Sequence, residues 1–365
     1  MSLFSIPLSI RSLFAACTFS IALSAIFAPQ IEAQNKVDYT KPADSAKPAD
    51  SAKPADYAKA ANAFLSSLPA ESLERAQLAY DSELRTKWHY LPFKDRRGVP
   101  LMSMTPAQRA KAIALFKTVL SEQGFTTLSK CMALEAILND IENAPDLRNP
   151  LKYYWTIFGK PAATGTWGLG VEGHHLSSNF VIRDNQLVCA TPLFIGANPA
   201  IVETLGKNRL GKGTRILAAE EDLGLELFAA LKKKQQKVAR VAATPPRDMR
   251  EGFKRQLQAK AAGLPAQEMD KAQRALLMKV VDQYLNHLPA DLASRLKKNI
   301  EKAGVERIQF AFAGEGALDK AHSYHVIGPT FAILFYNTQK GAGGTPVNHA
   351  HTVLRTNGRD FFLMD

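Results

Sequence analysis

Cysteine is scarce in this sequence, which has three cysteines among its 365 residues. No Cys-x-x-Cys pair, Gly-x-Ser-x-Gly elbow or phosphate-binding glycine loop occurs, so the sequence offers no motif for serine-hydrolase or nucleotide chemistry. Cys131 lies in a helical pattern and Cys189 in a strand pattern. An oxidising compartment would let them pair, yet both contexts suit buried thiols equally well, and we favour the unpaired alternative.

Long apolar runs are missing except near the N-terminus, where Leu13–Phe27 follows a single basic residue, Arg11. The pattern Ile31-Glu32-Ala33 comes next, as is typical of a secretory signal peptide that is cleaved after Ala33. A membrane anchor is the alternative, but the run is shorter than the roughly 20 residues that span a bilayer. We therefore expect residues 1–33 to be a signal peptide that takes Cys17 with it. The remaining protein is expected to be periplasmic or secreted, without a membrane-spanning segment.

A short repeat follows the predicted signal. The unit Lys-Pro-Ala-Asp recurs at Lys41, Lys47 and Lys53. Proline at every sixth position prevents helix formation, and alternating Lys and Asp keeps the segment solvated. We expect residues 34–58 to form an extended linker and residues 59–365 to form a single α+β domain.

Acidic residues are outnumbered, since 46 Lys and Arg stand against 34 Asp and Glu and give a net charge of +12. Residues 232–260 contribute +8 of this, with ten basic residues and two acids. This segment could bind an acidic ligand, or it could be a solvated pair of helix ends around Pro245. We do not expect nucleic acid as a partner, because Phe253 is the only aromatic residue among the basic ones and the protein is expected to be exported.

The remaining pattern predicts runs of helices and runs of strands. The predicted helices span residues 71–84, 106–123, 128–142, 216–236, 268–286 and 290–303, with Gly124 ending the second. The predicted strands span residues 153–158, 175–183, 187–195, 305–313, 322–328, 330–337 and 347–355, with a hairpin loop at 183–186. Separate runs indicate an α+β fold, in which a mainly antiparallel sheet packs with a helical N-terminal layer and intervening helices.

Histidines carry the clearest chemical signal, because six of the eight fall in three short strand-like segments. His349 and His351 form the first pair. Residues two apart on a strand project from the same face about 6.6 Å apart, so both imidazoles can reach one ion. Neutral imidazole is a common ligand of Zn, Cu, Fe and Ni.

His174 and His175 are adjacent, so a regular strand would point them to opposite faces. On that geometry His175 is the better ligand, and His174 could be a core residue that bonds to a backbone carbonyl. A glycine bulge at Gly173 could instead turn both rings towards one site. Glu172 could act as a ligand, as an orienter of an imidazole or as a base on metal-bound water.

The other histidines are weaker candidates. His322 and His325 are three residues apart, so at most one of them is expected to join the site. His89 and His287 lack nearby partners in the sequence and are expected to be ordinary surface residues.

Several motifs point to a known family. They are Trp167-Gly168, Glu172–Phe180, Ala190–Pro199, Leu217–Asp222, Gly328-Pro329, Asn337–Gln339 and Asn348–Val353. Together they resemble a bacterial domain-of-unknown-function family, number 3500, over most of residues 70–360. The resemblance implies membership and transfers no activity. It favours His322, which falls on a family histidine, over His325, where arginine is usual, and Leu334 and Tyr336 stand where the family usually has acids.

These patterns together predict an exported metal-binding protein. A Zn or Cu ion would be held by His349 and His351 with His174 or His175, and by His322. Three histidines and an open position would suit a hydrolytic or oxidative enzyme acting on a small molecule or polymer, with Glu172 as base or orienter. The alternatives are a periplasmic metal carrier without catalysis, a protein that binds an anionic ligand through residues 232–260, and a structural envelope protein with buried, hydrogen-bonded histidines.

Overall fold

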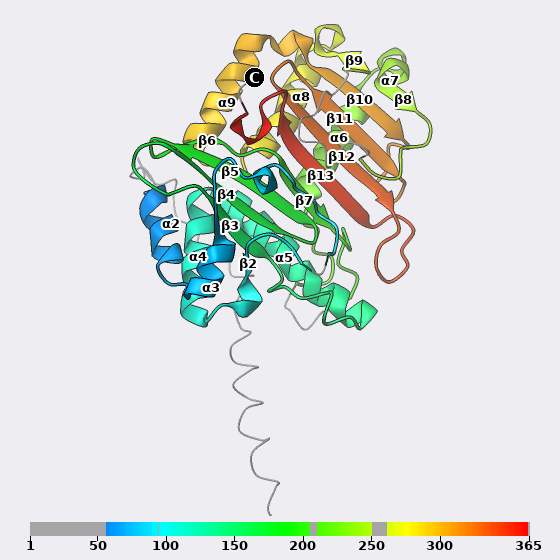
Figure 1. The fold of residues 1–365 in the computed structure, drawn as a ribbon. Coiled ribbons are helices and arrows are strands. Elements are labelled where there is room, and N and C mark those ends of the chain that lie inside the picture. The colour runs from blue at the N-terminus through cyan, green and yellow to red at the C-terminus, as the bar shows by residue number, and fades with distance from the viewer. Residues whose placement is uncertain (1–55, 94, 205–209, 250–260, 364–365) are drawn as a thin grey trace, which may run out of the picture. The chain divides into compact units, whose positions relative to one another are not determined.

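The computed structural model describes residues 56–93, 95–204, 210–249 and 261–363. The predicted signal peptide and most of the predicted linker lie outside these residues, and helix α2 begins at Tyr57. The described chain forms a 13-stranded, mostly antiparallel sheet with helices packed against it, so the predicted α+β class is confirmed (Figure 1). None of the helices in these ranges is both long enough and apolar enough to cross a membrane.

The helices follow the predicted pattern in most places. They are α2 (Tyr57–Leu65), α3 (Ala70–Ala76), α4 (Pro106–Thr118), α5 (Glu122–Glu142), α6 (Ala218–Ala230), α7 (Lys233–Ala239), α8 (Lys271–Leu285) and α9 (Ala290–Ala303). The prediction that Gly124 ends a helix is wrong. Gly124 lies in the first turn of α5, where a Cβ would come 2.1 Å from the carbonyl oxygen of His287, so glycine is needed for close packing.

The strands were predicted less completely. The longer ones are β3 (Tyr154–Phe158), β4 (Thr166–Gly173), β5 (Leu176–Arg183), β6 (Gln186–Cys189), β7 (Leu193–Ala197), β10 (Gln309–Gly314), β11 (His322–Ile327), β12 (Phe331–Gln339) and β13 (His349–Thr356). The predicted hairpin between β5 and β6 is confirmed. Strand β4 was missed, because its alternating glycines hide the strand pattern, and the predicted strand 187–195 is two strands with Pro192 between them.

The strand order is β1-β3-β4-β5-β7-β13-β12-β11-β10-β8, and β7 and β13 join the two halves at the centre (Figure 1). The short strands are β1 (Gln77–Leu78), β2 (Val99–Pro100), β8 (Arg240–Ala242) and β9 (Leu264–Pro265). β1 pairs with β3 in parallel and β2 pairs with it antiparallel. In the other half β8 pairs with β10 in parallel, and β9 pairs with β10 antiparallel. The sheet therefore repeats one topology twice.

Side-chain interactions repeat with the topology. Helix α4 begins with a capping box between Thr105 and Gln108, and α8 begins with one between Asp270 and Gln273. The Gln108 amide donates to the carbonyl of Ser67 after α2, and the Gln273 amide donates to that of Ala230 at the end of α6. The two halves thus share their strand pairing and these capping contacts, which indicates an internal duplication.

Gly98 and Gly263 occupy the same place in the two halves, at φ +90° and +93°. A Cβ at Gly98 would lie 2.5 Å from the Trp155 carbonyl oxygen, and one at Gly263 would lie 2.2 Å from that of Phe310. We expect alanine at either position to lower the free energy of unfolding by at least about 2 kcal/mol in urea unfolding, because strain and a backbone clash add.

The matched control is Gly213→Ala, since Gly213 has φ +86° but no atom within 4 Å of the added Cβ. Equal losses in all three variants would show that the close backbone packing shared by the two halves is unimportant for stability.

The two faces of the sheet carry separate cores. Leu354 belongs to the larger core, which includes residues of the helices such as Leu115 and Tyr284. The neighbouring Val353 belongs to a smaller cluster with Trp88 and Phe194. Adjacent residues of a strand point to opposite faces, so β13 contributes to both cores, and the segment around Trp88 covers the face away from the helices.

Candidate metal centre

His349 and His351 begin strand β13, and their side chains meet as predicted. Their Nε2 atoms lie 3.0 Å apart and their rings stand nearly perpendicular, at 89°. His351 is buried and His349 is half-buried. The strand spacing therefore brings two imidazole nitrogens to one point.

His174 and His175 form the tight turn between β4 and β5, rather than the start of a strand. Gly173 pairs with Leu176 across this turn, and a Cβ on Gly173 would lie 2.3 Å from the Tyr153 ring. His175 adopts φ +62°, a left-handed conformation that is uncommon outside glycine. The turn explains how the two adjacent histidines reach the same region. Their rings are stacked, with the centroids 3.7 Å apart.

Backbone contacts fix the position of His175. Its N–H donates to the carbonyl of Tyr90, and its own carbonyl accepts from the N–H of Gly196 on β7. The Cys131 thiol also donates to this carbonyl from helix α5, at 3.3 Å. Cys131 and Cys189 are both unpaired and buried, as we favoured.

The imidazoles of His175, His349 and His351 converge into one group that could hold a metal ion. His349 Nε2 lies 3.0 Å from the Nε2 atoms of both His175 and His351. Nitrogens bound to tetrahedral Zn²⁺ at about 2.0–2.1 Å lie roughly 3.4 Å from one another. These two distances need only lengthen by about 0.4 Å to match a three-histidine zinc site.

The partners of the outer ring nitrogens decide which nitrogens carry protons. His351 Nδ1 lies 2.9 Å from Oδ1 of Asp248, a carboxylate that can only accept, so Nδ1 carries the proton. Asp248 Oδ2 in turn accepts from the Tyr90 hydroxyl at 3.3 Å. In the neutral ring, His351 Nε2 is then a bare lone pair directed at His349 Nε2. A carboxylate behind a ligating histidine is a common arrangement at metal sites.

Burial favours the neutral forms of His349 and His175. It lowers the pKa of His349 to about 3, with the charge of His351 acting in the same direction. Burial, followed by the charge of His174, lowers the pKa of His175 well below 6.5. Burial alone would raise the pKa of Asp248, but its hydrogen bond and charge interaction with His351 bring the pKa below 3.8. The neutral imidazoles of His175 and His349 and the ionised, partly exposed carboxylate of Asp248 are protonation states that favour cation binding.

Comparison with known proteins gives the family and no activity. A family model described as a protein of unknown function (DUF3500) matches residues 50–362. The chain belongs to the DUF3500 family. No curated protein and no solved structure is detectably similar to it.

In this DUF3500 protein His174 lies beside the three-histidine group, in a second set with Glu135 and His175 that could also hold a cation. Its Nδ1 lies 2.5 Å from Glu135 Oε1, and Arg148 Nη1 lies 2.9 Å from the same nitrogen. Burial raises the pKa of Glu135 to about 8, against the opposing charge of Arg148. The guanidinium opposes a cation here, so we assign His174 to the support of the site.

Glu172 lies apart from these groups. It is buried, and its carboxylate pairs with Arg97 at 3.1 Å and with Arg96 at 4.0 Å. Burial raises the pKa of Glu172 although both guanidiniums act to lower it. Glu172 is not in either group of described residues that could hold a metal ion. It forms ion pairs with the two arginines instead.

His322 lies on the opposite face of the sheet from His351. It pairs with Asn337, which pairs with Ala350, and cross-strand partners share a face. Its neighbours there are the Lys320 carbonyl and Glu221. His325 is on the His351 face, but its Nε2 bonds to the hydroxyl of Tyr336 at 2.7 Å.

His287 is a correction, because it is 1% exposed rather than a surface residue. Its Nε2 lies 2.8 Å from Glu220 Oε1 on α6. The sequence shows no partner because Glu220 lies on α6, 67 residues earlier in the chain.

Asp248 and Glu135 are the two functional candidates that sequence reasoning missed. In the sequence Asp248 is one of two acids in the basic segment 232–260, and Glu135 lies inside a predicted helix. Neither has a local motif, because each reaches its histidine only through tertiary packing. In the described part of the basic segment, Lys232, Lys233, Lys234, Lys237 and Arg240 are exposed, and the remainder, residues 250–260, lies outside the described residues.

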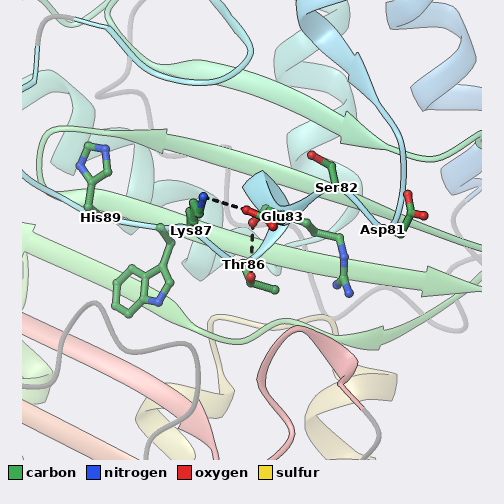
Figure 2. A pocket seen from close by; sticks show the side chains of 8 residues that line it. Asp81, Ser82, Glu83, Thr86, Lys87 and His89 are labelled. Atoms are coloured by element: carbon green, nitrogen blue, oxygen red, sulfur yellow. Dashed lines mark hydrogen bonds and ion pairs between the residues drawn. The ribbon is translucent and has the colours of Figure 1, made fainter.

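An open pocket of about 630 Å³ lies along residues 81–89 (Figure 2). Its charges are largely satisfied within the segment, since Lys87 pairs with Glu83 at 3.1 Å and Ser82 caps the short turn that follows. None of the three converging histidines lines it. We therefore do not assign a function to this pocket.

Proposed function

We propose that this protein binds one transition-metal ion, Zn or Cu, through the Nε2 atoms of His175, His349 and His351. The observation that carries the proposal is the convergence of three imidazole nitrogens on one point. His349 Nε2 lies 3.0 Å from the Nε2 atoms of both His175 and His351. A ring nitrogen carries either one proton or one lone pair, so His349 Nε2 cannot form an ordinary hydrogen bond with both neighbours, whereas one cation could bind all three nitrogens.

The surroundings support the same proposal. His175 is held by two backbone hydrogen bonds. The Tyr90 ring stacks on the Phe194 ring, with centroids 3.8 Å apart, and makes an edge-to-face contact with His351. Ligand side chains fixed in this way lose little entropy on binding an ion. The Asp248 carboxylate adds negative charge behind one ligand.

Three histidines leave a coordination position for water or substrate, and a metal ion there would supply Lewis acidity. His349 is the most exposed of the three residues, so access is expected from its side. We propose a metalloenzyme on this basis. A metal carrier would use the same ligands without turnover.

We test the proposal by metal analysis of the purified protein after dialysis against equimolar Zn²⁺ or Cu²⁺. One ion per chain is expected for the unchanged protein, and much less than one for His349→Ala. His349 is only half-buried, so this variant should fold. The matched control is His325→Ala. His325 lies on the same face of the sheet, but its imidazole bonds to the hydroxyl of Tyr336 and does not join the three-histidine group.

Retention of a full ion by His349→Ala, or loss of it by His325→Ala, would contradict the assignment. An unchanged protein that holds no stoichiometric ion would refute the proposal itself.

We also propose that the protein works outside the cytoplasm. The proposal is supported by the apolar run Leu13–Phe27 and by the small-residue site that ends at Ala33. Cell fractionation with N-terminal sequencing tests it, and an intact N-terminus in the cytoplasmic fraction would contradict it.

A further inference from the structure

We propose that the cavity between α9 and the β6–β7 region binds a small amphipathic carboxylic acid, with an apolar body and one anionic head. The cavity measures about 750 Å³, within the range of ~300–1,000 Å³ that is usual for small-molecule sites. This inference does not depend on the metal proposal.

The internal duplication places this cavity at the counterpart of the metal centre. The turn Gly173–Leu176, which holds His175, corresponds to Gly328–Phe331, which holds Thr330. Leu176 pairs with Ile195, and Phe331 pairs with Thr356. Thr356 and Ile195 are therefore equivalent positions. Counting back five residues from each shows that His351 corresponds to Ala190. Counting back seven residues shows that His349 corresponds to Val188. Val188, Ala190 and Thr330 all line the cavity.

A difference in helix length explains why this half is open. Helix α9 has 14 residues and ends at Ala303. Helix α5 begins at Glu122, and its fourteenth residue is Glu135, which therefore corresponds to Ala303. Helix α5 then continues to Glu142. In the first half Glu135 contacts His174, whereas in the second half a methyl group stands at that position and the helix stops. The space that side chains fill in one half is left for a ligand in the other.

The wall of the cavity is largely apolar. Its apolar residues come from two helices and two central strands, and include Leu285, Leu292, Leu296, Ile300, Phe331 and Leu354. All except Leu296 are buried. Such a wall suits an alkyl or aryl body, because burying apolar surface stabilises binding by about 25 cal/mol per Å².

The polar groups of the wall select an anion. Lys302 and Arg359 line the cavity, and within the described chain neither is paired with a carboxylate. The third cation, Arg355, is already neutralised by Asp360 at 2.6 Å. No Asp or Glu is among the described residues of the lining. Thr330 Oγ1 is buried there without a hydrogen-bond partner, so a ligand oxygen would satisfy it.

The experiment is calorimetric titration of the full chain with octanoate and, separately, with octan-1-ol. We expect one saturable octanoate site and at least ten-fold weaker binding of the alcohol. Combined Lys302→Ala and Arg359→Ala substitution should weaken octanoate at least ten-fold and leave octan-1-ol unchanged. Lys298→Ala, an exposed lysine on the same helix outside the lining, is the matched control and should change neither.

Ala303→Trp should abolish both ligands by filling the cavity at the helix end, where folding is tolerant. His349→Ala should bind octanoate like the unchanged protein, which separates this site from the metal centre. Failure of the folded protein to bind octanoate would overturn the proposal. So would equal affinity for the alcohol, or full octanoate binding by Ala303→Trp.

Discussion

Removing the metal ion with a chelator is expected to lower the free energy of unfolding by about 4 kcal/mol, when the free ion had been at roughly 1,000 times its dissociation constant. The proposed ligands come from the β4–β5 turn and from β13, segments that are far apart along the chain. The unfolded chain has no such preformed site, so binding energy adds to folding energy.

The measurement is urea unfolding with and without the chelator, monitored by circular dichroism. His349→Ala is the control, because without its central ligand the midpoint should be the same in both conditions. A chelator-dependent shift that persists in this variant would mean that the stabilising ion is bound elsewhere.

Replacing Asp360 with alanine is expected to destabilise the protein by about 3–5 kcal/mol. Its Oδ2 lies 2.6 Å from Arg355 Nε, and the two side chains are 0% and 1% exposed. Asp360 Oδ1 also accepts from the N–H of Thr356 at the end of β13. Without the carboxylate, the Arg355 guanidinium keeps its desolvation cost and loses its charged partner.

The control for this prediction is Asp291→Ala, which breaks an exposed pair with Arg295 at 3.2 Å on helix α9. Exposed pairs of this kind contribute about 0.3–0.5 kcal/mol. Thermal or urea unfolding of both variants decides the matter, and similar small losses would show that the Arg355–Asp360 pair is not structurally important.

Patterns that depend on neighbouring residues were predicted well from the sequence. Helix 290–303 has its predicted ends, with Pro289 before its first residue and Gly304 after its last. The spacing of His349 and His351 predicted that both rings face one point, since strand geometry alone decides it. Both features arise within a few residues of chain.

Features that depend on packing were not predicted. The sequence predicts a helix end at Gly124, but in the structure glycine at this position lets α5 approach the carbonyl of His287. The turn at His174 and His175 and the approach of Asp248 need contacts between distant segments. The duplication leaves only a short sequence signal: Val99-Pro100 precedes α4 as Leu264-Pro265 precedes α8, and Gln108-Arg109 recurs as Gln273-Arg274.

The central claim is that His175, His349 and His351 bind one ion. Anomalous diffraction from crystals grown with Zn²⁺ tests it most directly. We predict a single strong anomalous peak about 2.0–2.1 Å from all three Nε2 atoms, with Asp248 still bonded to His351. A peak bound by other residues, or none at this point in crystals that contain zinc, would contradict it.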